Sequence, residues 1–199
     1  MTVDPDAPLG NSRFPTPRPP RKAVGLAVPV IVGGTVAGLL WQYGVRHLPT
    51  GVAVNLGGFS NAQSVKSWLA TGAIFLAVVQ VLSAQAMYGK LPGSSRRGSR
   101  PWVSALHRWS GRAAFLAAVP VAAHCIYALG VQTFDTRTTV HSVAGCFFFG
   151  VFATKMLALR VQRIPNWALP LFGGLLFTAL FALWVTSALW FFSRNGIHY

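Results

Sequence analysis

Residues 168–192 read ALPLFGGLLFTALFALWVTSALWFF and contain no charged side chain. About 20 apolar residues suffice for an α-helix to cross the hydrocarbon core of a bilayer. Because lipid offers no hydrogen-bond partners, the backbone polar groups of such a segment must be satisfied within it, which favours a helix. This stretch therefore predicts a transmembrane helix and places the chain among the membrane proteins.

Four further apolar blocks precede this stretch, at about 23–45, 67–88, 103–129 and 139–159. The composition agrees, since hydrophobic residues make up 53% of the chain and charged residues only 10%, whereas a soluble domain carries about 25% charged residues. The sequence therefore predicts an all-α membrane protein, namely a five-helix transmembrane bundle that occupies residues 23–193.

The two ends of the chain differ from these blocks. Residues 1–22 are rich in proline, basic residues and small polar residues, which predicts a disordered tail. This tail does not have the form of a cleaved signal peptide, because it is long and proline-rich before the first apolar block. Residues 194–199 are expected to form a short tail outside the membrane.

The distribution of lysine and arginine predicts the orientation of the bundle. The segments on one side of the membrane carry twelve of these residues, the opposite side carries four, and Lys155 remains inside the fourth block. By the positive-inside rule, the N-terminus is cytoplasmic and the C-terminus lies outside. Because the basic residues separate the spans, the net charge of +14 does not predict nucleic-acid binding. We expect a multi-pass protein of a cell membrane.

Two histidines, His124 and His141, lie near the predicted outer ends of the third and fourth blocks. The blocks are joined by a short loop, residues 130–138, and consecutive helices with a short connection are usually neighbours. We therefore expect the two imidazoles to lie at similar depth in the membrane. This arrangement suits axial ligation of one haem iron, which is the predicted metal. Gly145 and Ala128 lie one helical turn from them and leave room for a flat cofactor, or equally for tight helix packing.

His107 is a candidate for a second site near the cytoplasmic side. It lies 17 residues before His124, roughly 25 Å along a helix, so the two cannot share a metal. Met87 and Met156 are possible partners, since His/Met ligation occurs in haem proteins. The alternative is that His107 anchors the helix at the membrane interface.

Other residues of the blocks allow less specific predictions. Lys155 is expected to snorkel to the cytoplasmic surface; the alternatives are contact with a haem propionate or a quinone carbonyl. Cys125 and Cys146 are expected to be buried thiols. Gly34 and Gly38, in the first block, have the spacing that permits close helix contact.

Two runs, LHRWSGRAAFLAAVPVAAHCIYALG (106–130) and TRTTVHSVAGCFFFG (136–150), resemble an uncharacterised family of small bacterial multi-pass membrane proteins. The likeness extends over most of the chain from the second block onward. More loosely, His107, Arg108 and Gly111 resemble a pattern of the b561-type membrane cytochromes. That resemblance implies b haems held by histidines on four central helices. This chain has no histidine in the second or fifth block, so one outer haem is what the resemblance implies here.

Together these features predict a b-type haem electron-transfer protein with an outer bis-histidine site. Its expected partners are the lipid bilayer, a quinone and a redox partner protein. The alternative is a non-catalytic membrane subunit or scaffold, whose histidines make interhelical hydrogen bonds. Whether the chain is an enzyme stays open, since a redox-active chain would be an electron carrier or an oxidoreductase subunit. No catalytic residue is predicted. A transporter is the weakest alternative, because there is no internal repeat and no membrane-embedded carboxylate.

Overall fold

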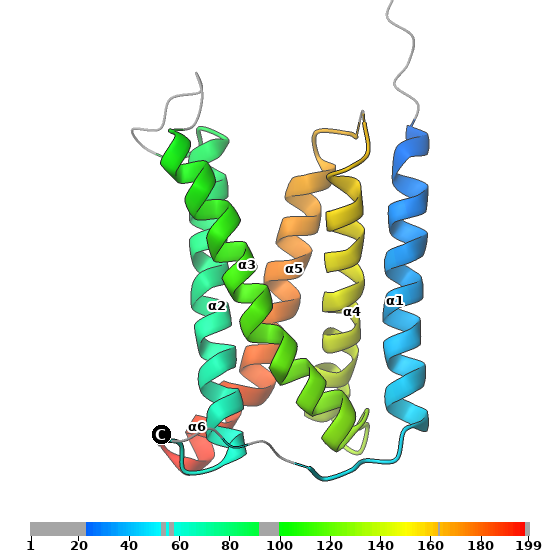
Figure 1. The fold of residues 1–199 in the computed structure, drawn as a ribbon, viewed down its shortest axis with the longest axis vertical. Helices are drawn as coiled ribbons and strands as arrows, with labels where there is room; N and C mark the ends of the chain where they lie inside the picture. Colours follow the sequence, from blue (N-terminus) through cyan, green and yellow to red (C-terminus); the bar gives the residue numbers. More distant parts are fainter. Residues whose placement is uncertain (1–22, 53–54, 56–57, 92–99, 163, 198–199) are drawn as a thin grey trace, which may run out of the picture.

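A computed structural model describes residues 23–52, 55, 58–91, 100–162 and 164–197 of the chain. Its described part is helical, with five helices that are long and apolar enough to cross a membrane (Figure 1). The elements are η1 (Ala23–Leu26), α1 (Ala27–Arg46), α2 (Ala62–Met87), α3 (Pro101–His124), η2 (Cys125–Leu129), α4 (Thr136–Ala158), α5 (Ala168–Trp184), η3 (Val185–Leu189) and α6 (Trp190–Asn195). The predicted five-helix, all-α membrane fold is confirmed. The tail predicted at 1–22 lies outside the described residues.

Polar caps extend two of the helices beyond the predicted apolar blocks. The side chain of Asn61 accepts hydrogen bonds from the backbone N–H groups of Gln63 and Ser64, so α2 begins at Ala62. Asp135 and Thr138 form a capping box, so α4 begins at Thr136. Such side chains satisfy the free N–H groups of a first turn at polar positions that hydropathy does not mark as helical.

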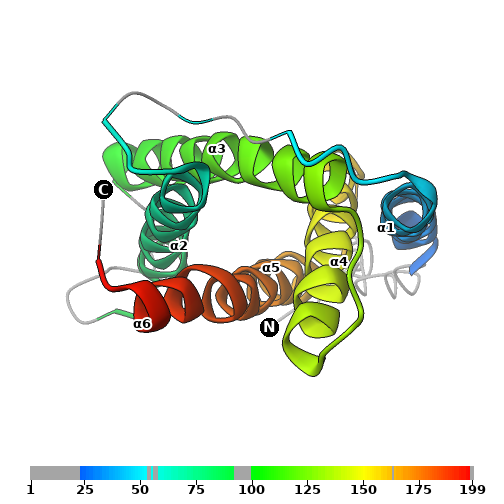
Figure 2. The same ribbon diagram turned by 90° about the horizontal axis from the view of Figure 1, so that it is seen from below.

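Four helices enclose a central space, and the fifth lies outside it (Figure 2). Helix α3 packs along α2, and α4 packs along α5, while α1 packs on the far side of α4. The consecutive helices α3 and α4 meet at their shared turn and then diverge, so that the two pairs α2/α3 and α4/α5 face each other across the space (Figure 1). We call the end where α2 and α4 begin, which is predicted to face outside, the outer end.

The contact between α1 and α4 depends on glycines of both helices. A Cβ atom added at Gly150 would lie 2.7 Å from the carbonyl oxygen of Gly33 and 2.9 Å from the Cβ of Ala37. The pair Gly34 and Gly38 has nothing within 4 Å and therefore does not make this contact. The spacing of Gly34 and Gly38 permits a close helix contact, but α1 is rotated so that Gly33, and not this pair, contacts α4.

The outer end is held by backbone hydrogen bonds between distant segments. The N–H of Gly51, in the loop after α1, donates to the carbonyl of Ala128 at 3.1 Å, and the N–H of Val131 donates to Gly44 at 2.9 Å. Gly130, between them, has φ +70°, a conformation that favours glycine. These bonds fix the turn that leads from α3 into α4.

Candidate functional site

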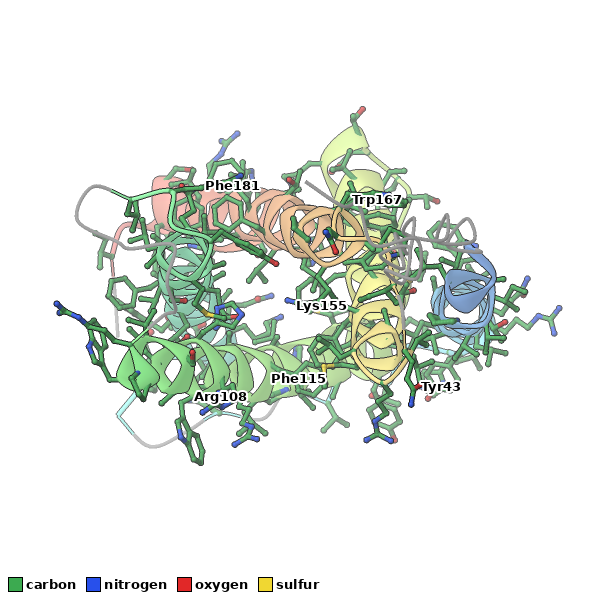
Figure 3. The ribbon with its side chains drawn as sticks, turned by 90° about the horizontal axis from the view of Figure 1, so that it is seen from above. Tyr43, Arg108, Phe115, Lys155, Trp167 and Phe181 are labelled. Atoms are coloured by element: carbon green, nitrogen blue, oxygen red, sulfur yellow. The ribbon has the colours of Figure 1, made fainter. Side chains whose placement is uncertain are left out.

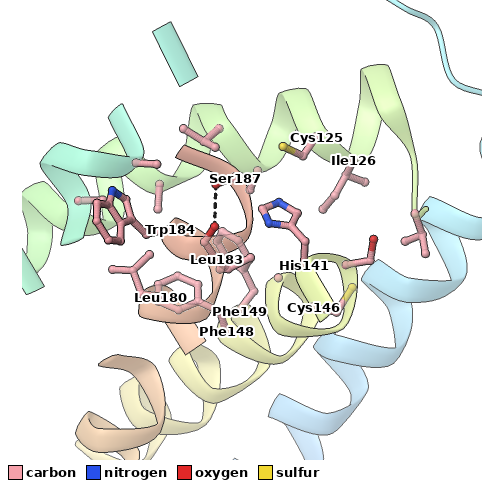
Figure 4. A pocket seen from close by; sticks show the side chains of 18 of the residues that line it. Cys125, Ile126, His141, Cys146, Phe148, Phe149, Leu180, Leu183, Trp184 and Ser187 are labelled. Atoms are coloured by element: carbon pink, nitrogen blue, oxygen red, sulfur yellow. Dashed lines mark hydrogen bonds between the residues drawn. The ribbon is translucent and has the colours of Figure 1, made fainter. Parts of the chain in front are cut away.

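A cavity opens in the outer half of the bundle, between α2, α3, α4 and the α5–η3 segment (Figure 4). The cavity has a volume of about 100 Å³. The wall is mainly aliphatic and aromatic. The lining residues are Ala70, Ala73, Ala118, Val121, Ala122, Cys125, Ile126, Gly130, Val131, His141, Ser142, Gly145, Cys146, Phe148, Phe149, Leu180, Leu183, Trp184 and Ser187.

Aromatic side chains lie at the inner boundary of this cavity. Phe115 of α3 stacks on Phe152 of α4, with ring centroids 4.1 Å apart and planes at 11°. Phe115 also meets the edge of Phe149, a lining residue, at 6.1 Å. Phe115 and Phe152 lie one turn beyond the innermost lining residues of their helices, so this cluster borders the inner side of the cavity on α3 and α4.

His141 is the imidazole of the cavity wall. Its Nδ1 lies 3.0 Å from Oγ1 of Thr186. The single hydroxyl proton of Thr186 is donated to the carbonyl of Ala182 at 2.7 Å, so Oγ1 accepts a hydrogen bond from Nδ1–H. In this arrangement Nδ1 carries the proton, and Nε2 carries the lone pair. Figure 4 shows the ring inside the cavity, between α4 and the segment that carries Cys125.

Thr186 lies in η3, a π-helical turn that interrupts the last transmembrane helix. Such turns are rare and occur frequently at functional sites. Arg137 stabilises this one, since its Nη1 donates to the carbonyl oxygen of Thr186 at 2.9 Å and its guanidinium lies 4.0 Å from the ring centre of Trp190. The first turn of α4 is therefore fixed against the π turn that orients His141.

Trp184 is a lining residue that the sequence did not single out. Its Nε1–H donates to Oγ1 of Thr71 at 3.0 Å, which links α5 to α2. Trp184 stands directly before the π turn and within the apolar block, away from the tryptophans at the span ends. This position within the apolar block is the sequence signal that could have distinguished Trp184 from the tryptophans of an interfacial aromatic belt.

His124 and Cys125 are neighbours in the chain, but only Cys125 lines the cavity. The cavity face of α3 runs through Ala118, Ala122 and Cys125, and at about 100° per residue His124 lies on the flank of that face. The cavity therefore brings His141 together with Cys125. A shared iron between His124 and His141 stays a prediction of the sequence.

His107 lies at the inner end of α3, where it joins α3 to α2. Its Nδ1 is 2.9 Å from Oγ of Ser83, which donates to the carbonyl of Gln80 at 3.1 Å. The amide of Gln80 in turn donates to the carbonyl of His107 and to Ser110. A Cβ added at Gly111 would lie 3.0 Å from Gln80, so the glycine of the His107–Gly111 pattern makes room for this network.

Lys155 extends from α4 toward the interior of the bundle (Figure 3). The expectation that Lys155 snorkels to the cytoplasmic surface stays a prediction. The side chains of Met87 and Met156, which were considered as partners of His107, are exposed.

Residues 26–199 match the model of a family of unknown function (DUF6529). The chain belongs to this family. The match includes all five spans. It confirms the expectation that the chain belongs to an uncharacterised family. No curated protein and no solved structure matches the chain. The looser likeness of this DUF6529 member to b561-type cytochromes stays a prediction. Among the described residues, no group of three or more His, Cys, Asp or Glu side chains gathers as a metal site.

Proposed function

We propose that this multi-pass membrane protein is a b-type haem electron-transfer protein that binds its haem in the outer cavity, with His141 as an axial ligand. The observation that carries this proposal is the imidazole of His141, which is held through Nδ1 by Thr186 and keeps Nε2 free in an apolar cavity. A hydrogen bond to the second ring nitrogen is the usual way in which metal-ligating histidines are oriented.

The remaining residues of the cavity also fit a haem. The group needs an apolar slot between helices, and small residues of three helices (Ala73, Ala118, Ala122 and Gly145) line this one. A neutral imidazole is the usual axial donor for b-type haem. Bound haem would supply one-electron redox chemistry. The chain itself orients the imidazole through Thr186 and excludes water with its phenylalanines.

The second axial position has two candidates on α3. His124 is the candidate that the sequence predicts, and Cys125 is the ligand-type side chain that lines the cavity. We propose a quinol in the membrane and a redox partner protein at the outer end, with the chain in a bacterial inner membrane.

A second function is favoured by one specific observation. Both His107 and His141 make hydrogen bonds to hydroxyl groups of neighbouring helices, Ser83 and Thr186. Interhelical bonds of this kind also stabilise membrane bundles that carry no cofactor. The alternative is therefore a non-catalytic membrane subunit or scaffold.

A spectrum distinguishes the two functions. The protein is expressed with a haem precursor, purified in mild detergent, and examined as oxidised and dithionite-reduced samples. A sharpened α-band on reduction, with haem extracted in proportion to protein, supports the electron-transfer proposal. Colourless protein that stays helical by circular dichroism and does not take up added haem contradicts it and favours the scaffold.

A further inference from the structure

Lys66 lies on the face of α2 that borders the cavity. The residues four and seven positions further along, Ala70 and Ala73, both line it, and residues at this spacing share one face of a helix. Lys66 is in the second turn of α2, at the outer end. It lies one turn further outward than Ala70, the outermost lining residue of α2. The ammonium group is therefore at the outer rim of the apolar cavity.

The chain provides almost no carboxylate for this ammonium group. Its three acidic residues are Asp4, Asp6 and Asp135. Asp135 is engaged in capping α4 and in an ion pair with Arg137 at 3.9 Å. Within the described part of the chain, Lys66 takes part in no hydrogen bond or ion pair. A cation inside a membrane span is costly unless it meets an opposite charge.

We propose that Lys66 binds the carboxylates of the ligand in the cavity, so that the propionates of the bound haem face the outer end. This inference rests on the proposed function. Phe148, Phe149 and Leu183 of the lining would contact the apolar body of the ligand, and Lys66 would hold its carboxylates at the rim. The site thus selects an amphipathic anion over an apolar molecule of the same shape.

Lys155 is the natural comparison for Lys66. It is also a lysine within a membrane span, and Asp135 is out of its reach because 20 residues of α4 separate the two, about 30 Å along the helix. Phe149 is the innermost lining residue of α4, and Lys155 lies six positions further inward, about 9 Å along the helix. Its neutralisation therefore serves as a matched control.

The test compares haem with its dimethyl ester, in which both carboxylates are blocked. Apo-protein in detergent is titrated with each porphyrin, for the wild type, Lys66→Met, Lys66→Arg and Lys155→Met. The wild type is expected to bind haem at least about tenfold more tightly than the diester, the order of magnitude for a charge-assisted hydrogen bond. Lys66→Met should lose this preference and keep the affinity for the diester, which also shows that the cavity is intact. Lys66→Arg and Lys155→Met should keep the preference.

The outcomes separate the two proposals. If the wild type binds haem and the diester equally, or if the preference persists in Lys66→Met and disappears in Lys155→Met, the role of Lys66 is wrong while the haem proposal stands. If Lys66→Met loses affinity for both porphyrins alike, Lys66 supports the fold and not the carboxylates, which also overturns the inference. If no variant binds either porphyrin, the proposed function itself fails.

Discussion

The Nδ1 atom of His141 and the hydroxyl of Thr186 lie 3.0 Å apart, across the boundary between α4 and the π turn of the last transmembrane helix. This hydrogen bond fixes both the orientation and the tautomer of the imidazole. It also joins two helices, since His141 and Thr186 are 45 positions apart in the sequence. The free nitrogen of His141 is therefore prepared by a residue that lies far away in the sequence.

Removal of the acceptor should weaken the site without removing the ligand. In Thr186→Val, His141 loses the bond that orients it, and we expect haem affinity to fall by about 10–100-fold, as for other partners of metal-ligating histidines. Haem titration of the purified protein measures this change. Ser187→Ala is the matched control, because Ser187 also lines the cavity but donates to the carbonyl of Leu183. Equal losses in both variants would contradict the role of Thr186.

Substitution of each histidine alone tests which residues hold the iron. His141→Ala should remove most of the bound haem, because the lone pair that enters the cavity is lost. The lining of the cavity predicts that His124→Ala retains haem, whereas a bis-histidine iron requires loss in either variant. Haem-to-protein ratios and reduced spectra decide between these outcomes. Retention of haem in His141→Ala would refute the assignment of the ligand.

The contact between α1 and α4 should not tolerate a side chain at Gly150. In Gly150→Val, the new atoms would meet the backbone of Gly33, and overpacking of this kind costs about 1–3 kcal/mol. Gly34→Val is the control, since nothing lies within 4 Å of its Cβ position. Thermal unfolding in detergent should show a lower midpoint for Gly150→Val alone. An equal decrease in both variants would point to helix propensity as the cause.

The capping box of α4 should make stability depend on acidic pH. The backbone N–H of Thr138, followed by the Thr138 hydroxyl and Arg137, holds the pKa of Asp135 below its usual value. Because the folded pKa is depressed, this contribution is fully present above the unfolded pKa, about 3.9, and is lost as the pH falls through the folded value. Asp135→Ala should therefore unfold at a lower temperature than the wild type at pH 7, and the difference should shrink below about pH 4. A difference that persists at pH 2 would contradict this explanation.

The positions of the five spans could be predicted from the sequence, because insertion of a segment depends on its own apolar residues. The remaining errors have local causes. The predicted blocks missed the starts of α2 and α4, where Asn61 and Asp135 cap the helices. The expectation that α3 and α4 pack side by side after their short turn was too simple. The two helices diverge from that turn, and the cavity lies between them.

The candidate site could be predicted only in part. His141 was singled out because an imidazole in an apolar block is unusual, and it does line the cavity. Its partner Thr186 was not singled out. A threonine in a transmembrane helix ordinarily forms a hydrogen bond with the backbone of its own helix, so the sequence does not indicate a contact with another helix. The π turns at Cys125 and Val185 leave no recognisable pattern in the sequence.

By itself, the sequence determined that this chain has five apolar spans and that Lys155, inside the fourth of them, has almost no carboxylate to meet. Both properties follow from the hydropathy and the number of charged residues, which do not depend on tertiary contacts. Only the tertiary structure decided that α1 lies outside the bundle, that Cys125 and not His124 lines the cavity, and that Thr186 orients His141. In lipid the apolar faces of a helix are nearly equivalent, so the rotation of each helix follows from packing and a few hydrogen bonds with its neighbours.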